Sequence, residues 1–343
     1  MNFYTLIFNH KNMSHKQWIV FFFKTVTILS VLIFLLNYIV DPYNITKQNL
    51  LGLKYKFISD DRTEKVAYFK TLQKFDNIMI GSSRVYSINP KKLSELLGGT
   101  TYNFGVGTAT VEDHLGILKY LIREDKIPKN LIIGIDYYTF NPDIPPNSYF
   151  LQNKELNFLT YTQQDKGLMF TKLFSLDALR GSVKTIKYNY FKKFTPRFDT
   201  NGWAGRYEDY TKRDQKRDLI KVKEEIQKDN LQLYFTHSKY KHIDAKRVAY
   251  YEEIRALCEQ YGIELYLFTT PLHPYLLQTL QKNPNTRNSL SEFVSYLSSF
   301  EHFTNLYHNK QIYNDLRNFH GSTHTSSNCG DTILEIILQG NSR

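Results

Sequence analysis

The chain of 343 residues has few cysteines, no internal repeat and no low-complexity tract. Its two cysteines, Cys258 and Cys329, lie in separate apolar helical patterns. We therefore interpret them as buried free thiols rather than a disulfide framework, and they say little about the cellular compartment. A chain of this length without repeats can form one sizeable core that carries insertions.

A signal-peptide cleavage site is also missing, although a long apolar run lies near the amino terminus. Trp18 to Val40 contains one full charge, Lys24, close enough to the amino end for its side chain to reach the headgroups. About 20 apolar residues cross a bilayer as a helix. A core helix of a soluble protein normally keeps a polar face, which this run lacks. Because Asn37 to Pro42 offers no small-x-small cleavage motif, we expect an uncleaved single-pass anchor.

The basic residues Lys11 and Lys16 precede this run and weakly favour a cytoplasmic amino terminus. The rest of the chain would then lie outside the cytoplasm. The expected organisation is a cytoplasmic terminus at 1–17, a transmembrane helix at 18–40, a polar linker at 41–74 and an α/β domain at 75–338 with an insertion at about 141–242.

After the linker, short apolar runs alternate with helical patterns. Ile78-Met79-Ile80 is bounded by polar residues and by Gly-Ser-Ser, which is typical of a strand buried on both faces. An amphipathic helix follows, entered through Pro90 and ended by Gly98. The same reading gives strands at 100–104, 131–136, 264–269 and 303–306, and helices at 109–124, 243–261 and 332–338. This alternation predicts a parallel sheet with helices on both faces.

The insertion contains most of the positive charge. Residues 181–250 hold 17 Lys or Arg and 9 Asp or Glu, in a chain with a net charge of +11. The basic-aromatic run from Lys184 to Lys193 could bind an anionic polymer, stack on sugar rings or lie against anionic lipid headgroups. It could also be an ordinary solvated surface. No nucleic-acid-binding motif accompanies the charge, and the apolar run argues against that class.

Residues capable of acyl chemistry fall at the predicted sheet ends. Ser82 and Ser83 follow the first strand, where open α/β sheets place their active sites, although they could simply cap the next helix. A serine hydroxyl becomes a good nucleophile when an imidazole takes its proton, and the resulting oxyanion needs N–H donors. His324, just before the last helix, could supply the imidazole, or it could be a surface histidine. No Cys, Asp or Glu cluster accompanies His320 and His324, so we expect no metal.

Four short motifs occur in a meaningful order: Gly81-Ser82-Ser83, Gly105-Val106-Gly107, Gly134-Ile135-Asp136 and Gly321-Ser322-Thr323-His324. In these motifs and their order, the chain resembles the SGNH (GDSL-type) hydrolase superfamily over residues of about 75–140 and 243–338. The resemblance is to its membrane-anchored bacterial branch, which includes alginate and peptidoglycan O-acetyltransferases and the D-alanyl transfer protein of lipoteichoic acid synthesis.

The resemblance implies a flavodoxin-like three-layer α/β sheet, no cofactor, Ser83 as nucleophile and His324 as base. Gly107 would belong to the oxyanion site, where Gly105 could serve equally, and Asp136 would take the place of the oxyanion asparagine. Two departures stand out. An ionised Asp136 would repel the oxyanion, and glycine occupies position 321, where the family has the aspartate that orients the histidine.

The sequence therefore suggests an acyl esterase or O-acyltransferase at the bacterial cell membrane, with its α/β domain outside the cytoplasm and a cell-surface glycan or polymer as substrate. Transfer rather than hydrolysis would involve a membrane-bound partner that donates the acyl group. The alternative is a catalytically inactive, membrane-tethered glycan-binding or assembly protein on the same fold, since a fold does not imply activity.

Overall fold

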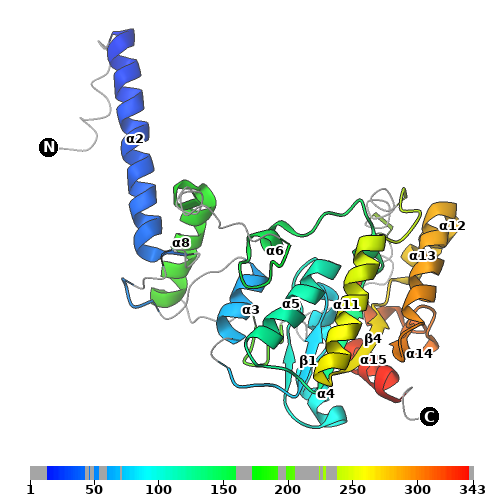
Figure 1. The fold of residues 1–343 in the computed structure, drawn as a ribbon. Coiled ribbons are helices and arrows are strands. Elements are labelled where there is room, and N and C mark those ends of the chain that lie inside the picture. Colours follow the sequence, from blue (N-terminus) through cyan, green and yellow to red (C-terminus); the bar gives the residue numbers. More distant parts are fainter. Residues whose placement is uncertain are drawn as a thin grey trace. The chain divides into compact units, whose positions relative to one another are not determined.

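The computed structural model describes residues 14–42, 46, 50–53, 60–69, 72–159, 172–191, 198–204, 224, 227–228 and 238–339. The chain forms two compact units, one of residues 1–59 and 161–195 and the other of residues 60–160 and 196–343. Much of the expected basic-aromatic insertion, including Lys192 and Lys193, lies outside the described residues. Figure 1 labels the main elements along the chain.

The larger unit is an α/β structure built on a five-stranded parallel sheet, as the alternating pattern predicted. The strand order is β2-β1-β3-β4-β5. All neighbouring strands run parallel, so their carboxyl ends share one edge. The order reverses between β1 and β3, and doubly wound sheets bind ligands in the crevice at such a point. The strands are β1 (Asn77–Ile80), β2 (Thr101–Asn103), β3 (Asn130–Ile135), β4 (Glu264–Thr269) and β5 (His302–Thr304).

Helices cover both faces of this sheet. Side chains alternate along each strand, and Ile78, Leu131 and Leu267 share one core with α5 (Val111–Arg123) and α11 (Ala245–Tyr261). Met79 and Phe268 point to the other face, where they pack with α4 (Pro90–Leu97) and α15 (Ser327–Gln339). Further elements of this unit are α3 (Asp61–Phe69), η1 (Ser83–Ser87), η2 (Tyr137–Phe140), α6 (Ser148–Gln152), α12 (Pro274–Lys282), α13 (Pro284–Leu297), α14 (Lys310–Tyr313), η4 (Leu316–Asn318) and the hairpin β6 (Phe319–His320) and β7 (His324–Thr325).

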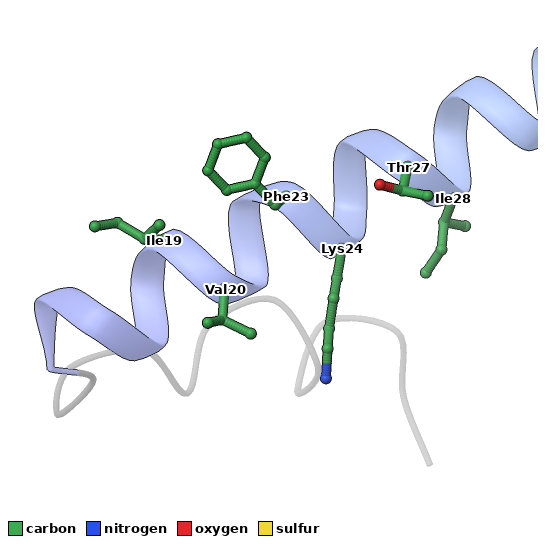
Figure 2. Close-up of a pocket in the computed structure, with 6 residues that line it drawn as sticks. All are labelled: Ile19, Val20, Phe23, Lys24, Thr27 and Ile28. Carbon is green, nitrogen blue, oxygen red and sulfur yellow. The ribbon is translucent and has the colours of Figure 1, made fainter.

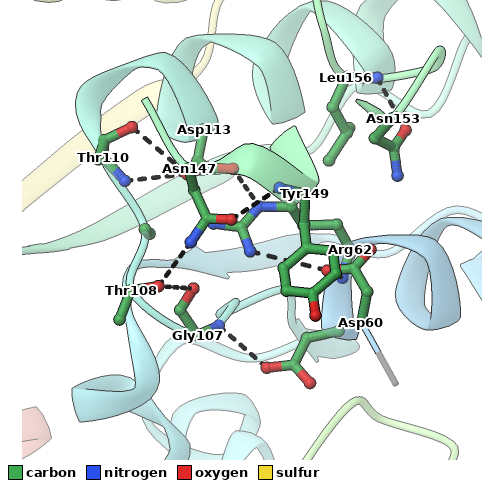
Figure 3. A network of polar contacts seen from close by, with 12 residues as sticks. Asp60, Arg62, Gly107, Thr108, Thr110, Asp113, Asn147, Tyr149, Asn153 and Leu156 are labelled. Atoms are coloured by element: carbon green, nitrogen blue, oxygen red, sulfur yellow. Dashed lines mark hydrogen bonds and ion pairs between the residues drawn. The ribbon is translucent and has the colours of Figure 1, made fainter. Parts of the chain in front are cut away.

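Helix α3 lies within the segment that the sequence analysis treated as a polar linker. Its charged side chains are buried and paired: Arg62 donates through Nε and Nη2 to the two carboxylate oxygens of Asp113 at 2.6 and 2.8 Å (Figure 3). Lys65 Nζ donates to the carbonyl oxygens of Asn103 and Gly202 at 2.6 and 3.0 Å. Val66 and Phe69 of α3 also pack into the core, but this short apolar pattern among charged residues does not reveal the helix by hydrophobic periodicity.

The smaller unit contains the apolar helix. Within the described residues, α2 (His15–Val40) is the one helix long and apolar enough to cross a bilayer, and none of its most apolar window is buried. A shallow hollow on α2 is lined by six of its own residues, among them Phe23 and Lys24, and we assign no ligand to it (Figure 2). The unit also contains η3 (Lys172–Phe174) and α8 (Leu176–Tyr190).

We expect the stability of the larger unit to fall in mild acid because of His114. This residue is fully buried on α5, and its Nδ1 lies 2.8 Å from the Tyr251 hydroxyl oxygen. Burial lowers the pKa of His114 to about 4 from its ordinary 6.5. Between these values the unfolded chain binds a proton that the folded chain excludes, so stability falls as pH drops, by about 3 kcal/mol at most.

The measurement is thermal unfolding of the full chain in detergent between neutral pH and about pH 4. His114→Gln should flatten the pH dependence while leaving part of it, because burial also lowers the pKa of His273 to about 4. A pH profile unchanged by His114→Gln would show that another group is responsible.

Candidate active site

The candidate site lies at the edge of the sheet where β1, β3 and β4 end. Ile80 pairs with Ile133, and Ile135 pairs with Thr269, so the residues that follow each strand meet at this edge. Ser83 begins η1 after β1, Asp136 follows β3, and Thr270 follows β4. This is also the place where the strand order reverses.

The structure brings Ser83 and His324 together from positions 241 residues apart. Ser83 Oγ lies 2.8 Å from His324 Nε2, which is hydrogen-bonding distance, and the pair is partly buried. With the proton on Nδ1, the hydroxyl donates to Nε2, and this is the arrangement in which imidazole can take the serine proton. Both residues were predicted from the order of the motifs and their placement at the sheet ends.

The helical turn that carries Ser83 is anchored by Val85, which fills the space left by three glycines. A Cβ at Gly81 would lie 2.7 Å from Val85 Cγ1, one at Gly134 2.5 Å from the same atom, and one at Gly105 2.5 Å from Val85 Cγ2. Atoms do not approach that closely, so each of these strand-end positions must lack a side chain. The glycines of three motifs therefore share one steric purpose: they seat η1 in the sheet edge.

Polar contacts from Asn103 and Thr325 fix η1 further. Asn103, buried at the end of β2, donates through Nδ2 to the carbonyl oxygens of Val85 at 2.8 Å and Ile88 at 3.3 Å. Ser87 Oγ lies 2.9 Å from Thr325 Oγ1 on β7. Ser83 and His324 also lie on η1 and β7. The Ser87–Thr325 contact is therefore a second link between these two elements, and it helps to hold Ser83 opposite His324.

The carboxylate of Asp136 is neutralised by its surroundings. Asp136 Oδ1 lies 3.1 Å from Arg84 Nη1 and accepts a hydrogen bond from the Thr270 hydroxyl. The Asp136 side chain is fully buried and that of Arg84 is 10% exposed, while the guanidinium lies over the ring of Tyr138. The sequence predicted a repulsive charge at this position without its partner, which is Arg84, the residue directly after the candidate nucleophile.

The backbone N–H groups of the second motif already have acceptors. Gly105 N–H donates to Asn103 Oδ1 at 2.9 Å, and Gly107 N–H donates to Asp61 Oδ2 at 3.0 Å. Gly107 could therefore serve an oxyanion only if Asp61 released it. Ser83, by contrast, is the first residue of η1, and its N–H has no carbonyl partner inside that turn.

The turn before His324 is built around Gly321, whose φ is 75°. This left-handed conformation strains most side chains, so the aspartate of the family pattern would be strained at this position, although Asp tolerates it better than most residues. The His324 Nδ1 instead lies 3.3 Å from Thr323 Oγ1. His273 contacts this turn: its backbone N–H donates to the carbonyl oxygen of Ser322 at 3.0 Å, and its imidazole caps α12.

Several residues of this site carry no signal in the linear sequence. Arg84, Asn103 and Thr270 belong to it only because the fold places them there.

In the part of the chain that the structure describes, no three His, Cys, Asp or Glu side chains gather as a metal-binding group would. Neither a protein-family model nor a curated protein matches the chain. The functional interpretation accordingly depends on the geometry around Ser83.

Filling the space beside Val85 should displace η1. Gly134→Ala places a methyl group 2.5 Å from Val85 Cγ1 and 2.9 Å from Phe268 Cζ, and overpacking of this kind costs about 1–3 kcal/mol. Val85→Ala alone should cost about 2 kcal/mol in lost burial. Because the smaller residue 85 makes room for the methyl group, the double variant should lose less than the sum, measured as the change in urea midpoint. Strict additivity would contradict the steric role assigned to Val85.

Breaking the Arg84–Asp136 pair from either side should be costly. Arg84→Met or Asp136→Asn leaves one buried charge uncompensated, a loss of about 3–5 kcal/mol. The double variant should recover at least about 1 kcal/mol of the summed loss in a double-mutant cycle. The matched control is the exposed pair Asp315–Arg317, 2.8 Å apart, where the same substitutions should cost much less than at the buried pair. Equal effects at the two pairs would contradict the interpretation.

Proposed function

We propose that this protein is a membrane-anchored serine acyl esterase or O-acyltransferase, and that its active unit faces the outside of the cytoplasm and acts on a cell-surface glycan or related polymer. The observation that carries the proposal is the 2.8 Å contact between Ser83 Oγ and His324 Nε2. It lies at the sheet edge where α/β enzymes place their sites.

The chemistry would proceed through an acyl-enzyme. Ser83 Oγ attacks the ester carbonyl carbon while His324 Nε2 takes the hydroxyl proton. The tetrahedral intermediate then expels the leaving alcohol, which receives that proton from the imidazolium. In the second half, water or a sugar hydroxyl gives its proton to His324 and attacks the Ser83 ester. The imidazolium returns the proton to Ser83 Oγ as the acid or the new ester leaves.

Charge at the oxyanion is the main electrostatic question for this mechanism. The Ser83 N–H, which begins η1, could donate to an oxyanion that forms on the acyl group of its own side chain. The Arg84–Asp136 pair is neutral as a unit, so the carboxylate no longer opposes that oxyanion as an isolated charge would. The family asparagine would donate a hydrogen bond; here Asp136 would act by holding Arg84 beside the nucleophile.

The setting of the site favours a large substrate at the cell envelope. The apolar helix α2 and the absence of a cleavage motif support an anchored chain, and Lys11 and Lys16 favour an inside amino terminus. A cell-surface polymer is the acceptor that the family resemblance implies. Water and a sugar hydroxyl enter the second half-reaction in the same way, so the proposal covers both hydrolysis and transfer.

A membrane-impermeant fluorophosphonate tests the nucleophile and the topology together. Applied to spheroplasts that express the full chain, it should label the protein without lysis, and Ser83→Ala should abolish the label. Ser82→Ala is the matched control, since this neighbouring serine caps η1 and should leave labelling intact. His324→Ala should slow acyl-ester turnover by about 10²–10⁴-fold, the usual contribution of a general base. The double variant should lose little more, because the two residues act as a unit.

The possible results distinguish the proposed enzyme from the inactive alternative and test its topology. Labelling that appears only after lysis would place the site in the cytoplasm. Full activity of Ser83→Ala on every acyl donor would refute the serine mechanism. If wild type and Ser83→Ala both fail to react but still bind glycan, the protein is the inactive binding or assembly protein instead.

A further inference from the structure

A polar contact joins α2 and α8 near the end of the apolar helix. Asn37 Nδ2 donates to the Leu173 carbonyl oxygen at 2.6 Å, and the Ser182 hydroxyl donates to Asn37 Oδ1 at 2.7 Å. Asn37 is fully buried although it stands in an otherwise apolar segment. Its amide is therefore satisfied by α8 and the residues just before it, and α8 lies beside the carboxyl-terminal turns of α2 (Figure 1).

The depth of this contact follows from the position of Lys24. Its side chain extends away from the helix, from where it can reach the headgroups on the amino-terminal side (Figure 2). From Trp18, where the apolar run begins, to Asn37 the helix rises about 28 Å, and a bilayer core is about 30 Å thick. Asn37 consequently lies near the opposite membrane interface, and α8 lies there with it.

Small residues form the face of α8 that packs within this unit. The buried positions are Ala178, Gly181, Ser182 and Thr185, which recur at helical spacing on one side. Small side chains that allow close helix approach, together with interhelical hydrogen bonds, are the usual means of helix association in membranes. In a water-soluble pair, larger apolar side chains would be expected at these positions.

The remaining surface of α8 is divided lengthwise into two edges. One edge exposes large apolar side chains, with Leu176 63% exposed, Val183 53% and Tyr190 62%. The other edge exposes Arg180, Lys184 and Lys187, together with Asp177, which pairs with Arg180 at 3.3 Å. A helix with an apolar edge and a basic edge is the pattern of segments that lie in a membrane interface, where acyl chains cover one and anionic headgroups face the other.

We infer that α8 is a second membrane attachment: an interfacial helix that lies on the outer leaflet beside α2 and binds anionic phospholipid headgroups. The inference rests on the proposed anchoring by α2. An anionic polymer could also contact Lys184 and Lys187, but it would leave Val183 and Leu176 in water. The lipid surface accounts for both edges, and the covalent continuity with α2 brings it within reach.

Site-directed spin labelling of the full chain in lipid nanodiscs tests this directly. Single labels are placed at Val183→Cys on the apolar edge, Lys184→Cys on the basic edge and Leu29→Cys in the middle of α2. Labelling is specific, because burial raises the pKa of both native thiols, Cys258 and Cys329, to about 12. Relative collision rates with oxygen and a water-soluble nickel complex then report the depth of each label.

In nanodiscs of phosphatidylcholine with phosphatidylglycerol, the labels at 183 and 29 should read as lipid-exposed and the label at 184 as water-exposed. Replacing Lys187 by Gln, or omitting phosphatidylglycerol, should move the 183 label toward water. A 183 label in water beside a 29 label in lipid overturns the inference and leaves the anchor intact. A 29 label in water overturns both this inference and the proposed anchoring by α2. A 183 label equally deep without anionic lipid overturns the headgroup recognition.

Discussion

The packing of Val85 against three glycines is the constraint on which the candidate site depends. The space for its two methyl groups exists only because Gly81, Gly105 and Gly134 have no side chains at the ends of three different strand regions. With that side chain seated, η1 cannot tilt or slide along the sheet edge. Ser83 lies two residues earlier on the same turn, so the seating of Val85 also fixes the position of Ser83 and its contact with His324. The proposed acyl chemistry would require such rigid placement of Ser83, since small displacements are costly to catalysis.

Around the candidate site ion pairs hold side chains in position, whereas apolar packing does so in the rest of the larger unit. Arg62 with Asp113 and Arg84 with Asp136 are largely buried ion pairs of the larger unit. Removing one partner of either pair would leave a largely buried charge uncompensated, which is costly. The buried apolar strands supply stability, and the ion pairs fix which residues meet.

Sequence reasoning succeeded where a local pattern has a single structural solution. The short apolar runs at 78–80 and 264–269 could be read as buried strands, and motif order brought Ser83 and His324 into one hypothesis. It failed for α3, whose inward residues Asp61, Arg62 and Lys65 look like a solvated face. It also failed for Arg84 and Thr270, because no linear pattern shows which cation compensates Asp136. Long-range electrostatic pairing is invisible until the fold is known.

The division of the chain into units has a consequence for how the protein could be released from a membrane. The smaller unit takes residues 1–59 and 161–195, so the polypeptide passes between the units at three places: near 59, near 160 and near 195. A chain joined to its anchor by one linker is shed by one proteolytic cut. Here a cut after residue 59 would leave the sheet still covalently joined to α8 on both sides. Under the proposed attachment of α8, release of the α/β unit would therefore require several cleavages, and a single cut would leave it on the membrane.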